Sequence, residues 1–179
     1  MNWWCDMDNY IPDMYQKSIY HIDYNKLKED GIKCLLFDLD NTCVPFKDKE
    51  PNKKLIELFE MLKDMDFKVI IFSNATKKRI TPFKNGLKVD CSASSKKPGT
   101  KKLLKVMRIF DYDLSDVAII GDQMCTDILC GNRVGIKTIL VNPMSKDDLL
   151  FTKIFRLVEK RMFKKFAKKG ILVKGKYYE

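Results

Sequence analysis

The sequence predicts an α/β protein with a doubly wound parallel sheet and no cap domain. Short apolar runs of the kind that form strands buried on both faces recur along the chain. Segments with the apolar spacing of amphipathic helices lie between these runs. This alternation implies parallel strands joined by right-handed crossovers, with helices on both faces of one sheet.

The expected elements follow one another along the whole chain. Residues 1–30 are rich in aromatic side chains and predict a leader made of loops and a short helix. Strands are expected at residues 32–37, 67–72, 87–91, 117–120 and 138–141. Helices are expected at residues 51–65, 77–85, 98–110 and 126–130.

Proline, glycine and apolar spacing define the expected helices. Pro51 and Pro98 are placed in first turns, where a helix does not need the amide that proline lacks. Gly86 is expected to end the helix at 77–85. In the helix at 51–65 the apolar residues have the spacing of one buried face, at Leu55, Leu58, Phe59 and Leu62.

The composition is that of a soluble globular protein with one domain. Of 179 residues, 45% are hydrophobic and 32% are charged, which allows one sizeable core. No apolar run is long enough to span a bilayer, and the N-terminus does not resemble a secretory signal. The six cysteines form no CxxC pair and are expected to be free thiols in a cytoplasmic protein. His21 is the only histidine, which excludes a site built from several histidines.

Most of the net charge lies near the end of the chain. Residues 151–179 contain ten Lys or Arg and two Glu, which account for +8 of the net charge of +10. The apolar residues of this segment fall on one helical face, formed by Phe151, Ile154, Phe155, Val158, Met162 and Phe166. Two interpretations stay open: a peripheral anchor on anionic membrane, or a helix packed on the domain formed by residues 1–150. For Trp3 and Trp4 the open interpretations are an interfacial membrane anchor and packing against the core.

Polar residues follow the expected strands. They are Asp38, Asp40 and Thr42 after the first strand, Ser73 and Asn74 after the second, Lys97 before a later helix, and Asp122 and Asp127 after the strand at 117–120. Because the carboxyl ends of parallel strands lie at one edge of the sheet, these side chains are expected to meet there.

These residue types suit the transfer of a phosphoryl group. Asp38 is predicted to attack phosphorus and form an aspartyl-phosphate, and Asp40 to protonate the leaving oxygen and then activate water. Mg²⁺ is expected between Asp38, Asp122 and the backbone carbonyl of Asp40, since it prefers hard oxygen ligands. Lys97 and the Ser73 hydroxyl would counter the charge of the phosphoryl oxygens.

The same motifs resemble those of the haloacid dehalogenase (HAD) superfamily of phosphatases. DLDNT at residues 38–42, FSN at 72–74, the lysine of KKPGTKK at 96–102 and GDQMCTD at 121–127 match its four motifs in order. The chain is also similar to the YqeG-like branch, which includes the mitochondrial phosphatidylglycerophosphate phosphatases. This second similarity rests on YxxSIYxIDYxKLKxxGIKxLLFDLDNT at 15–42, GDQxxTDxxxGNRxG at 121–135 and TKxxRxxExR at 152–161.

The resemblance implies a HAD-like fold and a role for each matched residue. Asp38 would be the nucleophile and Asp40 the acid and base, with Thr42 supporting their loop. Ser73, Asn74 and Lys97 would bind the substrate phosphate. Asp122 would bind Mg²⁺, and Asp127 would act beside it or through water. For Asn74 a turn, and for Arg133 a surface position at a helix end, are equally open interpretations.

The spacing of the motifs leaves no room for a folded cap. Thirty residues separate Thr42 from Ser73 and 23 separate Ser73 from Lys97, and each stretch is used by one helix and one strand. An uncapped site suits a phosphorylated substrate whose bulk stays outside. With the family resemblance, the leading prediction is phosphatidylglycerophosphate, an anionic phospholipid, hydrolysed at the inner face of the membrane. The alternatives are a soluble HAD phosphatase with another substrate and a nucleic-acid-binding protein that uses the basic tail.

Overall fold

A computed structural model describes residues 7–145 and 150–179, without the side chains of residues 150–154. One parallel sheet of six strands lies at its centre, in the order β1-β6-β5-β2-β3-β4. The strands are β1 (Met14–Gln16), β2 (Cys34–Phe37), β3 (Lys68–Phe72), β4 (Asp90–Ser92), β5 (Val117–Gly121) and β6 (Lys137–Val141). Because the chain builds the sheet outward from β2 in both directions, the predicted doubly wound α/β fold is confirmed.

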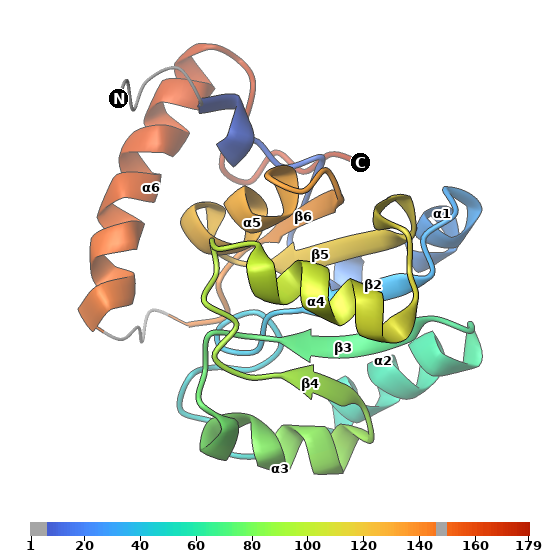
Figure 1. The fold of residues 1–179 in the computed structure, drawn as a ribbon. Helices are drawn as coiled ribbons and strands as arrows, with labels where there is room; N and C mark the ends of the chain where they lie inside the picture. The colour runs from blue at the N-terminus through green and yellow to red at the C-terminus, as the bar shows by residue number, and fades with distance from the viewer. Residues whose placement is uncertain (1–6, 146–149) are drawn as a thin grey trace.

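Helices cover both faces of this sheet, as Figure 1 shows. They are α1 (Tyr24–Glu29), α2 (Lys53–Asp64), α3 (Lys77–Leu87), α4 (Lys101–Phe110), α5 (Leu129–Asn132) and α6 (Leu150–Lys168). Side chains of α1, α2 and α3 pack on one face, and those of α4 and α5 pack on the other. No folded cap interrupts the described chain between β2 and β3 or between β3 and β4, where α2 and α3 lie.

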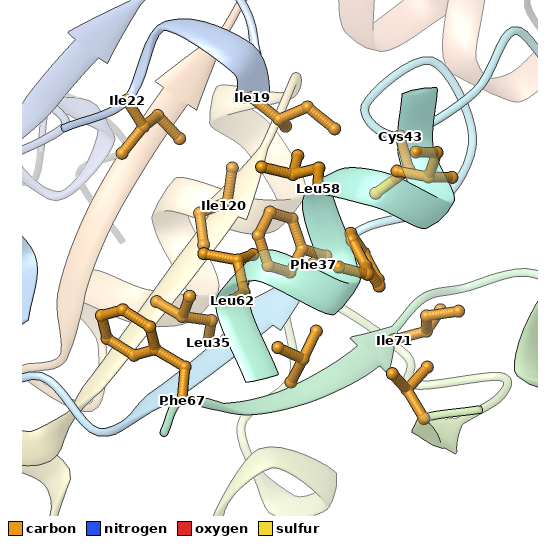
Figure 2. Close-up of a cluster of buried hydrophobic side chains, with 14 of the residues drawn as sticks. Ile19, Ile22, Leu35, Phe37, Cys43, Leu58, Leu62, Phe67, Ile71 and Ile120 are labelled. Carbon is orange, nitrogen blue, oxygen red and sulfur yellow. The ribbon is translucent and has the colours of Figure 1, made fainter. Parts of the chain in front are cut away.

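The two cores follow from the alternation of side chains along each strand. In β2, Leu35 and Phe37 point into the core beneath α2, whereas Cys34 and Leu36 point into the core beneath α4. Figure 2 shows the first core, which contains Phe37. The ring centroids of Phe37 and Phe59 lie 5.0 Å apart. Burial on both faces explains why the strands appear in the sequence as continuous apolar runs.

The leader contains one strand that the sequence pattern does not predict. Residues 14–16 form β1, which pairs in parallel with β6 at the edge of the sheet, so the prediction of loops is wrong there. The strand has only three residues and no visible periodicity. Its position depends on a distant contact instead: the carboxylate of Asp13 accepts hydrogen bonds from the Thr138 amide at 2.7 Å and hydroxyl at 2.9 Å.

Three predicted helix boundaries are also wrong. Pro51 and Pro98 lie before their helices rather than in first turns, because α2 begins at Lys53 and α4 at Lys101. Gly86 lies inside α3 and does not end it. A side chain at position 86 would place its Cβ only 2.7 Å from the ring of Pro51, so this glycine permits the close approach of two segments.

Helix α6 lies on the side of the sheet toward which the strand arrows point, at the carboxyl edge (Figure 1). Its second half packs on the domain through Met162, Phe163 and Phe166, of which Phe166 is fully buried. Closer to its start, Leu157 and Val158 are exposed. The helix therefore has one half held by apolar packing and one half with exposed apolar side chains.

Some predictions about the ends of the chain fall on parts that are not described. Trp3 and Trp4 lie outside the described residues, as do the side chains of Phe151 and Ile154. No helix within residues 7–145 and 150–179 combines the length and apolar character needed to cross a membrane. The five cysteines in the described part of the chain are free thiols.

Candidate active site

The parallel register brings the predicted site residues to one edge of the sheet. Phe37 of β2 aligns with Ile71 of β3 and Ile120 of β5, so the chain leaves all three strands at the same level. Asp38 follows β2 directly, and its amide donates to the carbonyl of Ile120 at 2.9 Å. Asp38 is therefore held between the residues that follow β3 and β5.

The turn after β2 brings Thr42 into contact with the loop that follows β5. Asn41 adopts a left-handed backbone conformation with φ of 64°, and its amide donates to the carbonyl of Val44. Asparagine tolerates this conformation better than most residues. The turn lets the Thr42 hydroxyl donate to Asp122 Oδ1 at 3.0 Å, and this contact ties the first motif to the fourth.

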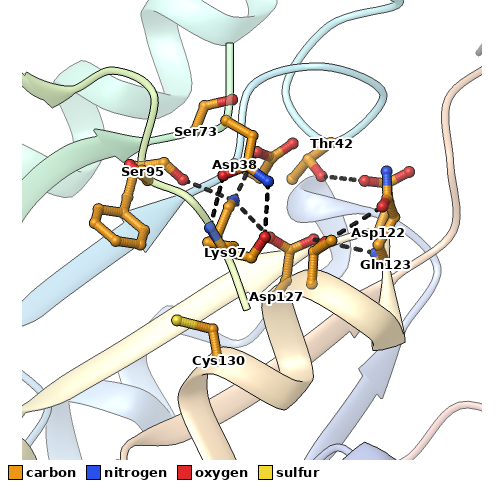
Figure 3. Close-up of polar contacts among 12 residues, drawn as sticks. Asp38, Thr42, Ser73, Ser95, Lys97, Asp122, Gln123, Asp127 and Cys130 are labelled. Carbon is orange, nitrogen blue, oxygen red and sulfur yellow. Dashed lines mark hydrogen bonds and ion pairs between the residues drawn. The ribbon is translucent and has the colours of Figure 1, made fainter. Parts of the chain in front are cut away.

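Lys97 is the centre of the polar cluster in Figure 3. Its ammonium group donates to Asp38 Oδ1 at 2.7 Å, to Asp127 Oδ1 at 2.5 Å and to the carbonyl of Phe72 at 2.8 Å. Its side chain is 1% exposed. Burial opposes the charge, but Asp127 and Asp38 outweigh burial and raise the pKa of Lys97 above its usual value. The lysine is therefore a fixed positive charge directly beside Asp38.

The segment that carries Lys97 is fixed by two side chains. Asn74 donates to the carbonyl of Lys97 at 3.0 Å and accepts from its amide at 2.8 Å. Arg133 donates to the carbonyl of Pro98 at 3.0 Å. Both polar atoms of the Asn74 side chain thus contact the backbone of Lys97, a different contact from the phosphate contact predicted for it. Ser73 lies buried at the end of β3, on the Asp38 side of the cluster (Figure 3).

Asp127 reaches Lys97 because the chain after β5 is tightly folded. A π-helical turn, Met124–Ile128, precedes α5, so the expected helix at 126–130 begins earlier and is irregular. Asp127 Oδ2 accepts from the amide of Gln123 at 3.2 Å. A Cβ at Gly121 would lie 2.2 Å from the Asp127 carboxyl carbon, so only glycine fits beside this carboxylate.

Arg79 is a site residue that the sequence analysis missed. It lies at the start of α3 and donates through Nε and Nη2 to Asp40 Oδ1, at 3.0 and 2.8 Å. Burial raises the pKa of Asp40 above its ordinary value; Arg79 opposes this rise and Asp38 adds to it. A carboxyl group with a raised pKa is suited to carry and donate a proton near neutral pH.

Arg156 of α6 is the second residue that was missed. It donates through Nη1 to the carbonyl of Asp122 at 2.8 Å and forms an ion pair through Nη2 with the Asp122 carboxylate. Glu159, one turn further along α6, pairs with Arg156 at 3.2 Å and accepts from the amide of Cys125 at 3.1 Å. The pattern TKxxRxxExR contains this pair, but nothing in the sequence indicates its partner. Helix α6 is thus attached to the loop that carries Asp122.

The buried cluster is rich in carboxylates. Burial raises the pKa of Asp122 to about 8, and Arg156 only partly compensates. The pKa values of Asp127 and Glu159 are also raised, mainly by burial. Five carboxylates lie in this part of the site, namely Asp38, Asp40, Asp122, Asp127 and Glu159. The cationic side chains bonded to them are Arg79, Lys97 and Arg156.

This donor set fits a divalent cation by its chemistry. If all groups are ionised, the carboxylates exceed the cationic side chains by two charges, the charge of one Mg²⁺. The hard oxygens of Asp38 and Asp122 are the kind of ligand that Mg²⁺ prefers. The described residues contain no group of three His, Cys, Asp or Glu side chains arranged around a metal position. Mg²⁺ commonly uses one or two carboxylates and completes its shell with water and substrate phosphate.

Comparison with known proteins places the chain in a family. The sequence model of the family described as mitochondrial PGP phosphatase matches residues 4–145. The Bacillus subtilis (strain 168) protein named "Probable phosphatase YqeG" is 37% identical over 161 residues, which cover 90% of this chain and 94% of that protein. Phosphatidylglycerophosphate phosphatase 1 of Arabidopsis thaliana is 27% identical over 175 residues, 90% of this chain. The chain spans about half the length of that plant relative, 49%.

Solved structures are similar in fold. A phosphatase from Haemophilus influenzae, YrbI, matches 76% of this chain and 90% of its own with a TM-score of 0.52 at 14% identity. A protein from Listeria monocytogenes serotype 4b matches 66% of this chain and 86% of its own with a TM-score of 0.52 at 18% identity. At such low identity these structures support the fold alone. The family match and the relative from Bacillus subtilis go further: the chain is a phosphatase and belongs to the mitochondrial PGP phosphatase family.

Proposed function

We propose that this protein is a Mg²⁺-dependent phosphatase that hydrolyses phosphatidylglycerophosphate to phosphatidylglycerol through an aspartyl-phosphate on Asp38. The observation that carries the chemistry is the buried contact of Lys97 with Asp38 and Asp127 at the carboxyl edge of the sheet. Lys97 occupies Asp38 Oδ1 and leaves Oδ2 for attack on phosphorus.

The reaction has two steps with complementary proton transfers. In the first, Asp38 Oδ2 forms a bond to phosphorus, the bond from phosphorus to the ester oxygen breaks, and Asp40 gives its proton to that oxygen. In the second, Asp40 removes a proton from water as the water oxygen attacks the phosphorus. The bond to Asp38 then breaks, which releases phosphate and restores both carboxyl groups.

The surrounding residues position and neutralise the reacting groups. Arg79 binds Asp40 Oδ1 and leaves its other oxygen to carry the proton. Lys97 and the Ser73 hydroxyl would counter the charge on the phosphoryl oxygens. Mg²⁺, held by Asp38, Asp122 and the carbonyl of Asp40, would supply additional neutralisation of the phosphoryl charge. Thr42 and Asp127 orient Asp122 and Lys97, respectively.

The substrate is proposed from the family and from the open site. A relative from Arabidopsis thaliana is named phosphatidylglycerophosphate phosphatase 1. In the described chain no cap is inserted between the motifs, so a lipid headgroup has access while its acyl chains stay in a membrane. The basic charges of α6 suit peripheral contact with anionic lipid at the cytoplasmic face of that membrane.

A phosphate-release panel tests this function. Phosphatidylglycerophosphate, a nucleotide monophosphate and a sugar phosphate are compared in Mg²⁺ and in excess chelator. We expect the lipid to be the best substrate and the chelator to abolish turnover. Preferred hydrolysis of a soluble phosphate would support the alternative of a soluble phosphatase with another substrate. Full activity in chelator would refute the role of Mg²⁺.

Two substitutions test the catalytic assignments. Asp38→Asn should remove nearly all turnover, because an amide cannot form the acyl-phosphate. Asp40→Asn should lower turnover by roughly 10²–10⁴-fold, the usual contribution of a positioned acid and base. Circular dichroism should show an unchanged fold in both variants. Wild-type turnover by the Asp38→Asn protein would refute the covalent mechanism.

A further inference from the structure

A groove extends from the candidate active site along α6. It has a volume of about 560 Å³ and begins at Asp122 and Arg156, which also belong to the reacting centre. It runs between α6 and the end of β6, and reaches Val173 and Lys174 in the segment after α6. The groove therefore adjoins the catalytic cluster at the carboxyl edge of the sheet and shares Asp122 with it.

The apolar side of this groove is preformed. Leu140 and Phe163 line it, and both belong to the cluster that fixes α6 on the domain. Tyr15 lies at the same site, with its ring 6.1 Å from that of Phe163 and its hydroxyl donating to Asn142 at 2.6 Å. Because these side chains are held by packing and hydrogen bonds, the groove does not have to be created when a ligand binds.

The charged side of the groove consists of lysines without an acidic partner. Lys160, Lys164 and Lys174 line it, and none of the three forms an ion pair or hydrogen bond within the described chain. The two carboxylates of the lining, Asp122 and Glu159, are both paired with Arg156. The groove thus combines an apolar floor with a positive charge that no described side chain neutralises.

Two of these lysines lie on α6 at fixed distances from Arg156, which contacts the catalytic loop. Lys160 lies one helical turn beyond Arg156, about 6 Å along the axis, and Lys164 lies two turns beyond it, about 12 Å. A second phosphate that is joined to the reacting phosphate by a single glycerol would lie within this interval. An alkyl chain attached to that second phosphate would then meet Leu140, Phe163 and Val173.

We infer that this groove is the subsite for the part of the substrate beyond the reacting phosphate. Lys160, Lys164 and Lys174 bind a phosphodiester, and the apolar floor binds the start of an acyl-bearing glycerol. The inference rests on the proposed function, because it takes the substrate to be an amphiphile with a second phosphate. It adds a specific recognition site to what would otherwise be a general attraction of a basic helix to a membrane.

The test compares two triple variants that remove the same charge from the same region. Lys160→Gln, Lys164→Gln and Lys174→Gln are combined in the groove variant. Arg161→Gln, Lys168→Gln and Lys169→Gln are combined in the control, since these residues are exposed and do not line the groove. Substrates are short-chain phosphatidylglycerophosphate below its micelle concentration and glycerol 3-phosphate. Both are monomeric, so attraction to a membrane does not contribute.

The groove variant should lower kcat/KM for the short-chain lipid by about tenfold or more, mainly through KM, because charged hydrogen bonds are lost. Its kcat/KM for glycerol 3-phosphate should change less than about twofold, and the control should change neither substrate. Ala167→Trp, which fills the groove without changing its charge, should also raise KM for the lipid alone.

Equal loss on both substrates, equal loss in both triple variants, or no loss would overturn the subsite. The wild-type protein tests the proposed function separately. If it hydrolyses glycerol 3-phosphate but not the lipid, the lipid substrate and the subsite both fail while the phosphatase chemistry stands. If it hydrolyses the lipid and only the variant pattern fails, the proposed function stands and the subsite falls.

Discussion

Replacing Arg156 by methionine would test the attachment of α6 to the catalytic loop. The substitution keeps an apolar stem but removes a guanidinium that contacts the carbonyl and carboxylate of Asp122 and the carboxylate of Glu159. The Asp122 side chain is fully buried and that of Arg156 is 20% exposed. The variant therefore leaves Asp122 with the Thr42 hydroxyl as its remaining side-chain hydrogen-bond partner in the described chain.

The magnitude follows from the burial of the pair. Removing one partner of a buried ion pair costs about 3–5 kcal/mol. Here the partial exposure of Arg156 and the ability of Asp122 to take up a proton, with its pKa raised to about 8, reduce that cost. We expect a loss of about 3 kcal/mol in the free energy of unfolding at neutral pH in chelator. Mg²⁺ at 100 times its Kd stabilises a folded protein that binds it by about 2.7 kcal/mol. The deficit of the variant therefore shrinks in Mg²⁺ only if the loss of Arg156, which competes for Asp122, lets the variant bind the cation more tightly than the wild type does.

Urea unfolding with and without Mg²⁺ measures both quantities. Arg161→Met is the matched control, because Arg161 is exposed on the same helix and forms no ion pair in the described chain. It should change stability by less than about 0.5 kcal/mol. If Arg156→Met is as stable as this control, the contact with Asp122 is not a buried charge pair. If Mg²⁺ stabilises neither the wild-type protein nor the variant, the cation does not bind at Asp122.

Three other predictions concern separate parts of the site. Arg79→Gln should lower kcat about tenfold or more, because Asp40 loses a charged hydrogen bond. Lys78→Gln, which changes an exposed neighbour, should leave kcat unchanged, and equal rates in the two variants would remove Arg79 from the mechanism. In chelator, the free energy of unfolding should fall as pH rises from about 4 to 8, by at most about 1.4 kcal/mol per pH unit from Asp122, because the folded state holds a proton on this carboxyl group that the unfolded state has already lost. Asp122→Asn should flatten this slope, and an unchanged slope would contradict the raised pKa. Neutralising Lys160, Arg161, Lys164 and Lys165 should weaken binding to anionic vesicles in a salt-dependent way, as measured by co-sedimentation, and unchanged binding would leave α6 without a membrane role.

The fold and the position of the motifs were predictable because they depend on local patterns. Strands buried on both faces are largely apolar, and β2, β5 and the part of β3 that follows Lys68 fulfil this condition. Once these strands are parallel, the residues that follow them meet at one edge. The convergence of Asp38 and Lys97, 59 residues apart, follows from that rule and is seen in the structure.

Other features were not predictable because they depend on contacts between distant segments. β1 is a strand because of its pairing with β6 and the contact of Asp13 with Thr138, 125 residues away. Arg79 and Arg156 stand in basic helices in which every cation has the same appearance in the sequence. Their carboxylate partners lie 39 and 34 residues away, and only the packing of α3 and α6 selects them.

The basic C-terminal segment shows what such packing adds to a count of charges. In the sequence its ten basic residues form one feature, but in the structure those whose side chains are described differ in their surroundings. Arg156 is bound to buried carboxylates, Lys160 and Lys164 line the groove, and Lys168 is exposed to solvent. Salt screens an exposed charge strongly and a buried pair weakly. High salt should therefore weaken vesicle binding by the exposed lysines while the attachment of α6 to Asp122 persists, so the two roles of one helix can be separated by ionic strength alone.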